Sequence, residues 1–168
     1  MNKSIRIADR LIGTEHPPFI IAEMSGNHNQ SLERALEIVD ASAKSGVHAL
    51  KIQTYTADTI TLDVEEGEFL IKDPGLLWKG QSLYNLYKQA YTPWEWHVPI
   101  FNRCRELGLI AFSTPFDETA VDFLEDIHVP AYKIASFENN HIPLIRKTAA
   151  TGKPLIISTG MASIAELD

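Results

Sequence analysis

Several short apolar runs in this 168-residue chain end in side chains that can bind or transfer charge. The run FIIAE ends in Glu23, and the run HALKIQT places Lys51 and Gln53 at alternate positions. The run AYKIAS places Lys133 in a similar setting. Alternate positions of a β-strand share one face, so Lys51 and Gln53 would point to the same side of a sheet. Further polar residues end or follow the later runs: Ser113, Thr114, Ser136, Glu138, Ser158 and Thr159.

Two lysines at one site need anions, because an interior charge costs several kcal/mol unless it is paired. A phosphorylated or carboxylated substrate would satisfy Lys51 and Lys133. The alternative is that each lysine pairs with a nearby carboxylate, Glu23 or Glu138, and only closes the core. His28 in the loop SGNHN has two interpretations as well, a contact with a ligand or a cap on the helix that follows.

The polar groups are held by a regular alternation of predicted strands and helices. The segment SLERALEIVDASAKSG has apolar residues on one helical face and ends at Gly46, which predicts a helix after the first strand. The apolar positions of that face are Leu32, Ala35, Leu36, Val39 and Ala43. Four more strands are predicted at residues 48–54, 109–114, 131–136 and 154–159, with helical segments between them. The helix before the third strand is expected to begin with a capping box from Thr92 to Glu95.

Strands that alternate with helices indicate an α/β fold with a parallel sheet covered on both sides. An open doubly wound sheet and a TIM (β/α)8 barrel both satisfy this pattern. No G-x-G-x-x-G follows the first strand, and a barrel would bring all the polar strand ends to one mouth. We therefore expect a barrel, with residues 5–12 as a hairpin that plugs its bottom. Residues 55–92 form a long insertion after the second strand, of a length that is usually functional or mobile.

Composition excludes several classes of function. The 15 basic and 22 acidic residues give a net charge of −7 without a basic stripe, so we expect neither nucleic acid nor an anionic membrane as a partner. No apolar run has the length of a signal peptide or a membrane span, and the single cysteine, Cys104, fits a reducing compartment. We therefore expect a cytoplasmic enzyme that acts on small molecules. The histidines show no spacing typical of a metal site.

Four stretches of the chain resemble the sialic acid synthase family of phosphoenolpyruvate-dependent nonulosonic acid synthases. They are AEMSGNHNQSLERALEIVDASAKSGVHALKIQ, FSTPFDETAVDFLE, YKIASFENNHIPLI and KPLIISTGMAS, in the order and at the spacing of the family. The likeness runs from Ile20 to the end of the chain. The spellings SGNHN and SFENN, with the segment LYNLYKQAYTPWEW, favour the pseudaminic branch of the family.

The resemblance implies a TIM-barrel enzyme that condenses phosphoenolpyruvate with an aldehyde sugar, giving a nine-carbon α-keto acid and phosphate. For the pseudaminic branch the sugar would be a 2,4-diacetamido-2,4,6-trideoxy-hexose. A divalent metal, Mn²⁺ or Mg²⁺, would hold the aldehyde. Glu138 would be the acid/base group, and Glu23 would lie on the sugar or metal side. The remaining substrate contacts implied are Lys51, Lys133, Ser136 and Ser158 for phosphoenolpyruvate, together with Gln53, Asn27 and His28.

The family pattern continues beyond what this chain contains. Residues 1–168 supply the hairpin and five of eight barrel strands, and a capping box from Ser163 to Glu166 predicts another helix. We expect the metal-binding histidines of the family beyond Asp168, followed by an antifreeze-like domain that reaches into the partner's active site in a homodimer. These 168 residues alone are expected to be inactive.

Three alternatives remain open from the sequence. The acceptor could be that of an N-acetylneuraminate or legionaminate synthase, because few positions distinguish the branches. The same fold could instead carry a Schiff-base aldolase with Lys133 or Lys51 as nucleophile. A non-catalytic half-barrel that binds an anion or a protein partner is the alternative from another class.

Overall fold

The sheet of this protein is parallel and its strands follow one another in sequence order. The computed structural model describes residues 4–168. Five strands pair in the order β3-β4-β5-β6-β7, every pair parallel. A sequential order belongs to a barrel, whereas a doubly wound sheet reverses its order. The structure is therefore an α/β half-barrel, whose strands are β3 (Ile21–Glu23), β4 (Ala49–Thr54), β5 (Ile110–Pro115), β6 (Tyr132–Ile134) and β7 (Leu155–Ile157).

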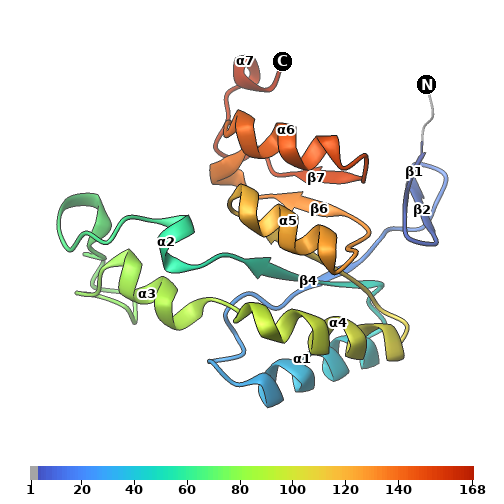
Figure 1. Ribbon diagram of the computed structural model, residues 1–168, viewed down its shortest axis with the longest axis horizontal. Helices are drawn as coiled ribbons and strands as arrows, with labels where there is room; N and C mark the ends of the chain where they lie inside the picture. Colours follow the sequence, from blue (N-terminus) through green and yellow to red (C-terminus); the bar gives the residue numbers. More distant parts are fainter. Residues whose placement is uncertain (1–3) are drawn as a thin grey trace.

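Helices cover the outer face of this sheet (Figure 1). The helix predicted after the first strand is confirmed as α1 (Leu32–Lys44), with Ser31 as its N-cap. Gly46 follows it with a φ of +80°, which glycine adopts without strain. The other covering helices are α4 (His97–Glu106), α5 (Glu118–Asp126) and α6 (Ile142–Ala150), and the short α7 (Ile164–Leu167) follows β7. The predicted capping box at Ser163 is present in α7.

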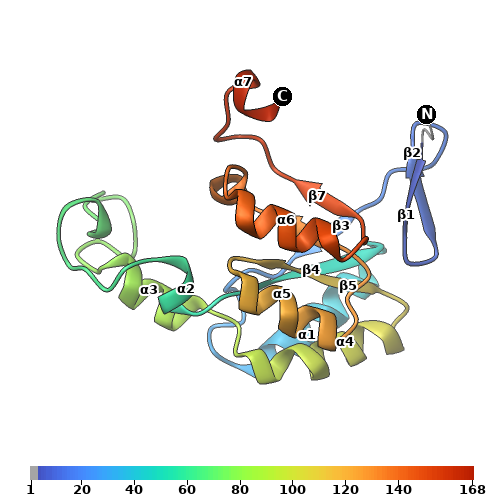
Figure 2. The same ribbon diagram turned by 45° about the horizontal axis from the view of Figure 1, so that its top comes forward.

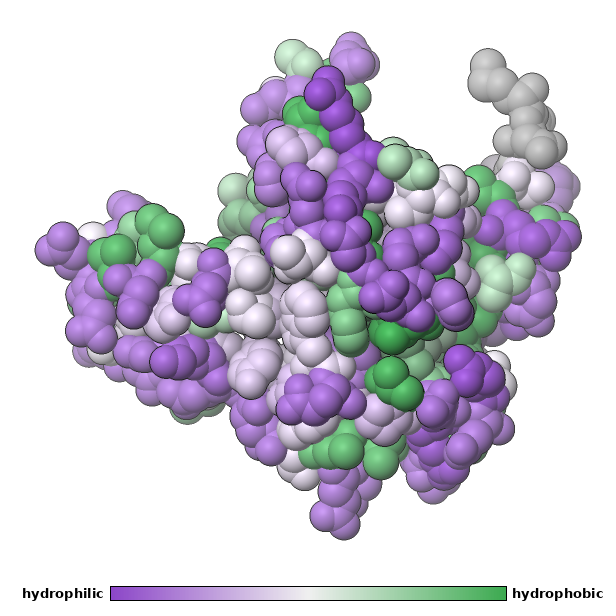
Figure 3. All heavy atoms as spheres, viewed as in Figure 1, coloured by the Kyte–Doolittle hydropathy of each residue, from purple (hydrophilic) through white to green (hydrophobic). Residues whose placement is uncertain are grey.

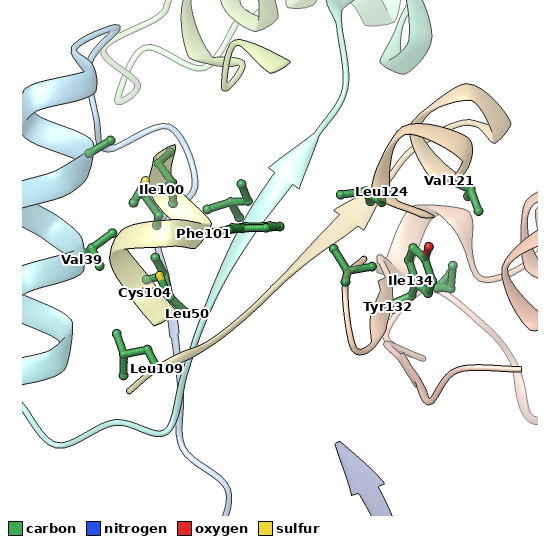
Figure 4. Close-up of a cluster of buried hydrophobic side chains, with 14 of the residues drawn as sticks. Val39, Leu50, Ile100, Phe101, Cys104, Leu109, Val121, Leu124, Tyr132 and Ile134 are labelled. Atoms are coloured by element: carbon green, nitrogen blue, oxygen red, sulfur yellow. The ribbon is translucent and has the colours of Figure 1, made fainter. Parts of the chain in front are cut away.

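The core is divided by the two faces of the strands. Outward residues such as Leu50, Ile52 and Ile134 are fully buried with side chains of the covering helices (Figure 4). Inward residues at the amino ends of the strands form a second cluster that includes Ala49 and Phe112. The alternation of faces along each strand thus separates a helix-covered core from the barrel interior.

A hairpin closes the amino ends of the strands. It consists of β1 (Ser4–Ile7) and β2 (Arg10–Gly13), paired antiparallel. Ile7 is fully buried in the inward cluster with Ala49, Phe112 and Ala131. Figure 2 shows the hairpin at the end of the sheet opposite to the insertion after β4. The predicted hairpin is therefore present and packs on the barrel interior from below.

The insertion at residues 55–92 is more ordered than a loop. It contains α2 (Ala57–Ile60), a 3₁₀ turn η1 (Gly67–Phe69) and α3 (Leu83–Ala90). It follows the carboxyl end of β4 and lies at the end of the sheet opposite to the hairpin (Figure 2). Most of its visible surface is hydrophilic, with a hydrophobic group at its far end (Figure 3).

The helix expected from Thr92 begins later and differently. A 3₁₀ turn, η2 (Trp94–Trp96), precedes α4, and no side chain caps it. The hydroxyl of Thr92 is buried and lies 3.2 Å from Nε2 of His28 instead. The local capping pattern is thus replaced by a long-range contact. Within residues 4–168, no helix has both the length and the apolar character needed to cross a membrane.

Candidate active site

Lys51 on β4 contacts polar residues of both neighbouring strands in the mouth of the half-barrel, the space at the carboxyl ends of its strands. It is opposite Glu23 in the register of β3 and β4, and its Nζ lies 3.5 Å from Oε1 of that carboxylate. Nζ also donates to Oγ1 of Thr114 at 3.3 Å. The residue is only 7% exposed, and burial lowers the pKa of the ammonium while Glu23 opposes that shift. Lys51 is therefore a desolvated cation with one carboxylate neighbour.

Lys133 adds a second cation to the same mouth. Its Nζ donates to Oγ of Ser158 at 2.6 Å and to the carbonyl of Ile134 at 2.8 Å. Burial lowers the pKa of Lys133 and the positive charge of Lys51 lowers it further, while the charges of Glu23 and Glu138 oppose the shift. The two ammonium groups are thus near enough to repel each other.

Among the described residues, only one of these two cations has a carboxylate at salt-bridge distance. Within residues 4–168, Lys133 forms no salt bridge, and the Glu23 side chain that faces Lys51 is 59% exposed. Simple pairing with a carboxylate, the alternative considered from the sequence, accounts for Lys51 alone. The geometry leaves positive charge available for an anionic ligand.

Glu138 lies near enough to Lys133 for their charges to interact. It ends a 3₁₀ turn, η3 (Ser136–Glu138), that follows β6. With Gln53 and Ser136 it lines a cavity of about 650 Å³. Its Oε2 is buried without a hydrogen-bond partner among the described residues, and burial raises the pKa of the carboxyl group. A carboxyl group with a raised pKa and a free oxygen is suited to proton transfer.

The loop after β3 places Asn27 and His28 differently from the lysines. Asn27 is exposed, and its Nδ2 donates to the carbonyl of Met24 at 2.9 Å. His28 is fully buried, its Nδ1 accepts from the backbone amide of Gln30 at 3.2 Å, and its Nε2 lies 3.2 Å from the Thr92 hydroxyl. Burial lowers the pKa of the imidazole, which favours the neutral ring. The structure therefore shows His28 supporting its own loop, and contact of either residue with substrate stays a prediction.

A sequence model of the NeuB family matches residues 38–168. This chain belongs to the NeuB family. Pseudaminic acid synthase of Helicobacter pylori is 47% identical to it over 151 residues, 90% of this chain and 44% of that protein. The crystal structure of the spore coat polysaccharide biosynthesis protein SpsE of Bacillus subtilis matches with a TM-score of 0.75 at 35% identity, over 98% of this chain and 42% of the other.

A third relative is the N-acetylneuraminic acid synthetase of Leptospira borgpetersenii, whose crystal structure matches this NeuB-family chain with a TM-score of 0.80 at 29% identity. The match covers 98% of this chain and 52% of that one. The chain spans 44% of the length of the curated pseudaminic acid synthases it matches. The half-barrel described above is thus part of the NeuB-family barrel.

Part of the site of this NeuB-family chain was missed by sequence reasoning. The aromatic wall of the cavity comes from Tyr55, Tyr87 and Phe116, none of which was a candidate. A signal was present for α3, because Leu83 and Tyr87 in LYNLYKQA are four residues apart and share a helical face. Tyr55 and Phe116 each follow a strand directly, as apolar residues that carry no chemical signature.

Proposed function

We propose that this chain is the amino-terminal part of a pseudaminic acid synthase, which condenses phosphoenolpyruvate with a 2,4-diacetamido-2,4,6-trideoxy-hexose. The observation that carries the proposal is the presence of two partly desolvated cations, Lys51 on β4 and Lys133 on β6, of which only Lys51 has a salt bridge among the described residues. Identities of 47% to pseudaminic acid synthases of Helicobacter pylori and Campylobacter jejuni support the acceptor. The products are pseudaminic acid and inorganic phosphate.

Binding of phosphoenolpyruvate is assigned to the two lysines and to two serines, Ser136 and Ser158. Charge-assisted hydrogen bonds to phosphate and carboxylate oxygens are strong in a site shielded from water. Ser158 already accepts a hydrogen bond from Lys133, so the hydrogen of its own hydroxyl is free to donate to the anion. The lysine thus both attracts the ligand and orients a second donor.

In the proposed reaction, Glu138 lies beside the carbon atoms that react. C3 of phosphoenolpyruvate forms a bond to the C1 aldehyde of the sugar, water adds at C2, and phosphate leaves with cleavage of its carbon–oxygen bond. Glu138 takes the proton of the attacking water and returns it, for which its raised pKa brings it nearer to neutral pH. Glu23, Gln53, Asn27 and His28 belong to the sugar side in this proposal.

The described residues do not supply a complete set of ligands for the divalent metal. Within residues 4–168, no three His, Cys, Asp or Glu side chains come together as a metal site would require. Carboxylates such as Glu23 would hold Mn²⁺ or Mg²⁺ only weakly by themselves, so the ion would need ligands beyond Asp168. A homodimer and a cytoplasmic location complete the proposal.

Phosphate release tests the function. A chain extended to the full length of the relatives should release phosphate from phosphoenolpyruvate and the diacetamido sugar in the presence of Mn²⁺. Turnover with N-acetylmannosamine instead would move it to the sialic acid branch. A borohydride-trapped adduct of pyruvate on a lysine would favour the aldolase, and binding of phosphoenolpyruvate without any turnover would favour the non-catalytic half-barrel.

A further inference from the structure

The cavity of about 650 Å³ is lined by two unlike sets of side chains. The polar set includes Gln53, Ser136 and Glu138, which lie at or just after the carboxyl ends of β4 and β6. The apolar and aromatic set comes in large part from the insertion at residues 55–92. It consists of Tyr55, Ile60, Leu83, Tyr87, Phe116 and Phe137, and Thr61 of the insertion adds a hydroxyl. The acid/base carboxylate and the insertion thus face the same space.

The aromatic side chains of this cavity are held in place by packing. Tyr55 is 3% exposed and meets the rings of Tyr87 and Phe116 edge to face, at centroid distances of 5.6 and 5.4 Å. Its carbonyl accepts a hydrogen bond from the indole of Trp94 at 3.4 Å. Side chains that are already ordered lose little entropy when a ligand binds. The wall is therefore formed before any ligand arrives.

Tyr87 belongs to this aromatic wall and lies near the proposed acid/base group, Glu138. It lies in α3, and the charge of Glu138 adds to burial in raising the pKa of its hydroxyl. The phenol is consequently near the carboxylate while its ring packs on Tyr55. A molecule whose reacting atom lies at Glu138 would have the rest of its body against the insertion.

We infer that the insertion forms the acceptor-specificity wall of the active site, in which Ile60, Leu83 and the aromatic side chains hold methyl-bearing groups of the acceptor. The inference rests on the proposed function, because it places the aldehyde sugar with its reacting carbon at Glu138. Deoxy and acyl methyl groups would gain contact there. A hydroxyl in the same place would be buried among groups that offer it few hydrogen bonds, which disfavours hydroxylated sugars by up to about 10²-fold.

The test uses the full-length enzyme and compares kcat/KM for the diacetamido trideoxy sugar with kcat/KM for N-acetylmannosamine. Leu83→Asn should lower that ratio about tenfold or more, since it replaces apolar contact with a hydrogen-bonding group. The KM for phosphoenolpyruvate should stay unchanged. Leu77→Asn is the matched control, because Leu77 belongs to the same insertion, is 97% exposed and does not line the cavity.

The possible results separate the inference from the proposed function. An unchanged ratio in both Leu83→Asn and Ile60→Asn overturns the inference and leaves the function standing. A wild-type enzyme that uses only N-acetylmannosamine overturns the proposed acceptor. In that case the wall is supported if Leu83→Asn raises the KM for N-acetylmannosamine, and it is overturned if that KM is unchanged. Leu83→Ala, which favours the helix, repeats the measurement if Leu83→Asn unfolds. A wild type that uses neither sugar overturns both.

Discussion

The ammonium of Lys133 donates to the hydroxyl of Ser158 at 2.6 Å and so joins the end of β6 to the residue that follows β7. The contact fixes a cation and a hydroxyl donor side by side, without a carboxylate in a salt bridge to Lys133 among the described residues. A site of this kind is prepared for an anion before the anion binds. Its energetic consequences can be measured one group at a time.

Lys133→Met and Lys51→Met should each raise the KM for phosphoenolpyruvate strongly or abolish turnover of the full-length enzyme. Removal of one cation leaves ligand charge uncompensated in a shielded site, which costs on the order of 2–5 kcal/mol. Steady-state kinetics of phosphate release provide the measurement. Lys79→Met, at an exposed position of the insertion, is the control. Wild-type kinetics in both mouth variants would show that the lysines are structural.

Glu138→Gln should lower kcat by about 10²–10⁴-fold and change KM little, because the amide keeps the shape but cannot take a proton. The same variant should raise the Tm. Burial raises the pKa of Glu138 above its ordinary value, so its contribution to stability is present at acid pH and lost as pH rises through that pKa. At neutral pH the ionised group therefore costs free energy, and glutamine removes that cost. An altered KM with unchanged kcat would assign Glu138 to positioning.

Binding of phosphoenolpyruvate should weaken on the alkaline side, beginning below the ordinary lysine pKa of about 10.4. Burial lowers the pKa of Lys51 and of Lys133, so each loses its proton earlier than a free lysine, and only the charged form attracts the anion. Binding should consequently take up protons, which calorimetry in buffers of different ionisation enthalpy detects. Lys133→Arg stays charged and should move the loss of binding to higher pH. A flat KM up to pH 10 would contradict this mechanism.

His28→Phe should lower the free energy of unfolding by about 1–3 kcal/mol, because it leaves the buried hydroxyl of Thr92 without its partner and removes the acceptor of the Gln30 amide. Urea unfolding measures the loss. Thr92→Val alone and combined with His28→Phe gives the coupling between the two side chains, which should be non-additive. If stability is unchanged while the KM for a substrate rises, His28 is a ligand contact as its loop position indicates.

Residues 1–168 expressed alone should release no phosphate and should self-associate. Within the described residues β7 pairs only with β6, so its other edge offers unpaired backbone groups, and Ile157, Met161 and Ile164 beside it are exposed. Light scattering and the phosphate assay check both parts. A monodisperse, active 168-residue chain would contradict the assignment of missing strands and metal ligands to a longer protein.

The sequence predicted those features that depend on local pattern. All five strands and α1 were expected, because burial of a strand or of one helical face imposes a period that can be counted. One strand end differs from the prediction. The run predicted through Ser136 leaves the sheet after Ile134, and a 3₁₀ turn then brings Glu138 to the cavity.

Contacts between distant segments were beyond the reach of the sequence. Thr92 satisfies a capping pattern locally, yet its hydroxyl is used by His28, 64 residues away. The pairing of Lys133 with Ser158 depends in the same way on the closure of the sheet. The polar residues at the strand ends could be predicted from the sequence. Their hydrogen-bond partners depend on the three-dimensional packing and could not.

The hairpin beneath the barrel has a consequence for the order of assembly on the ribosome. Ile7 is synthesised well before Ala49, Phe112 and Ala131, but the cluster that buries it requires all three. The amino-terminal segment must therefore wait, with its apolar side chains in water, until the fourth barrel strand has emerged. Docking of the hairpin is then a late step, and it seals the sheet from below only when most of this chain has left the exit tunnel.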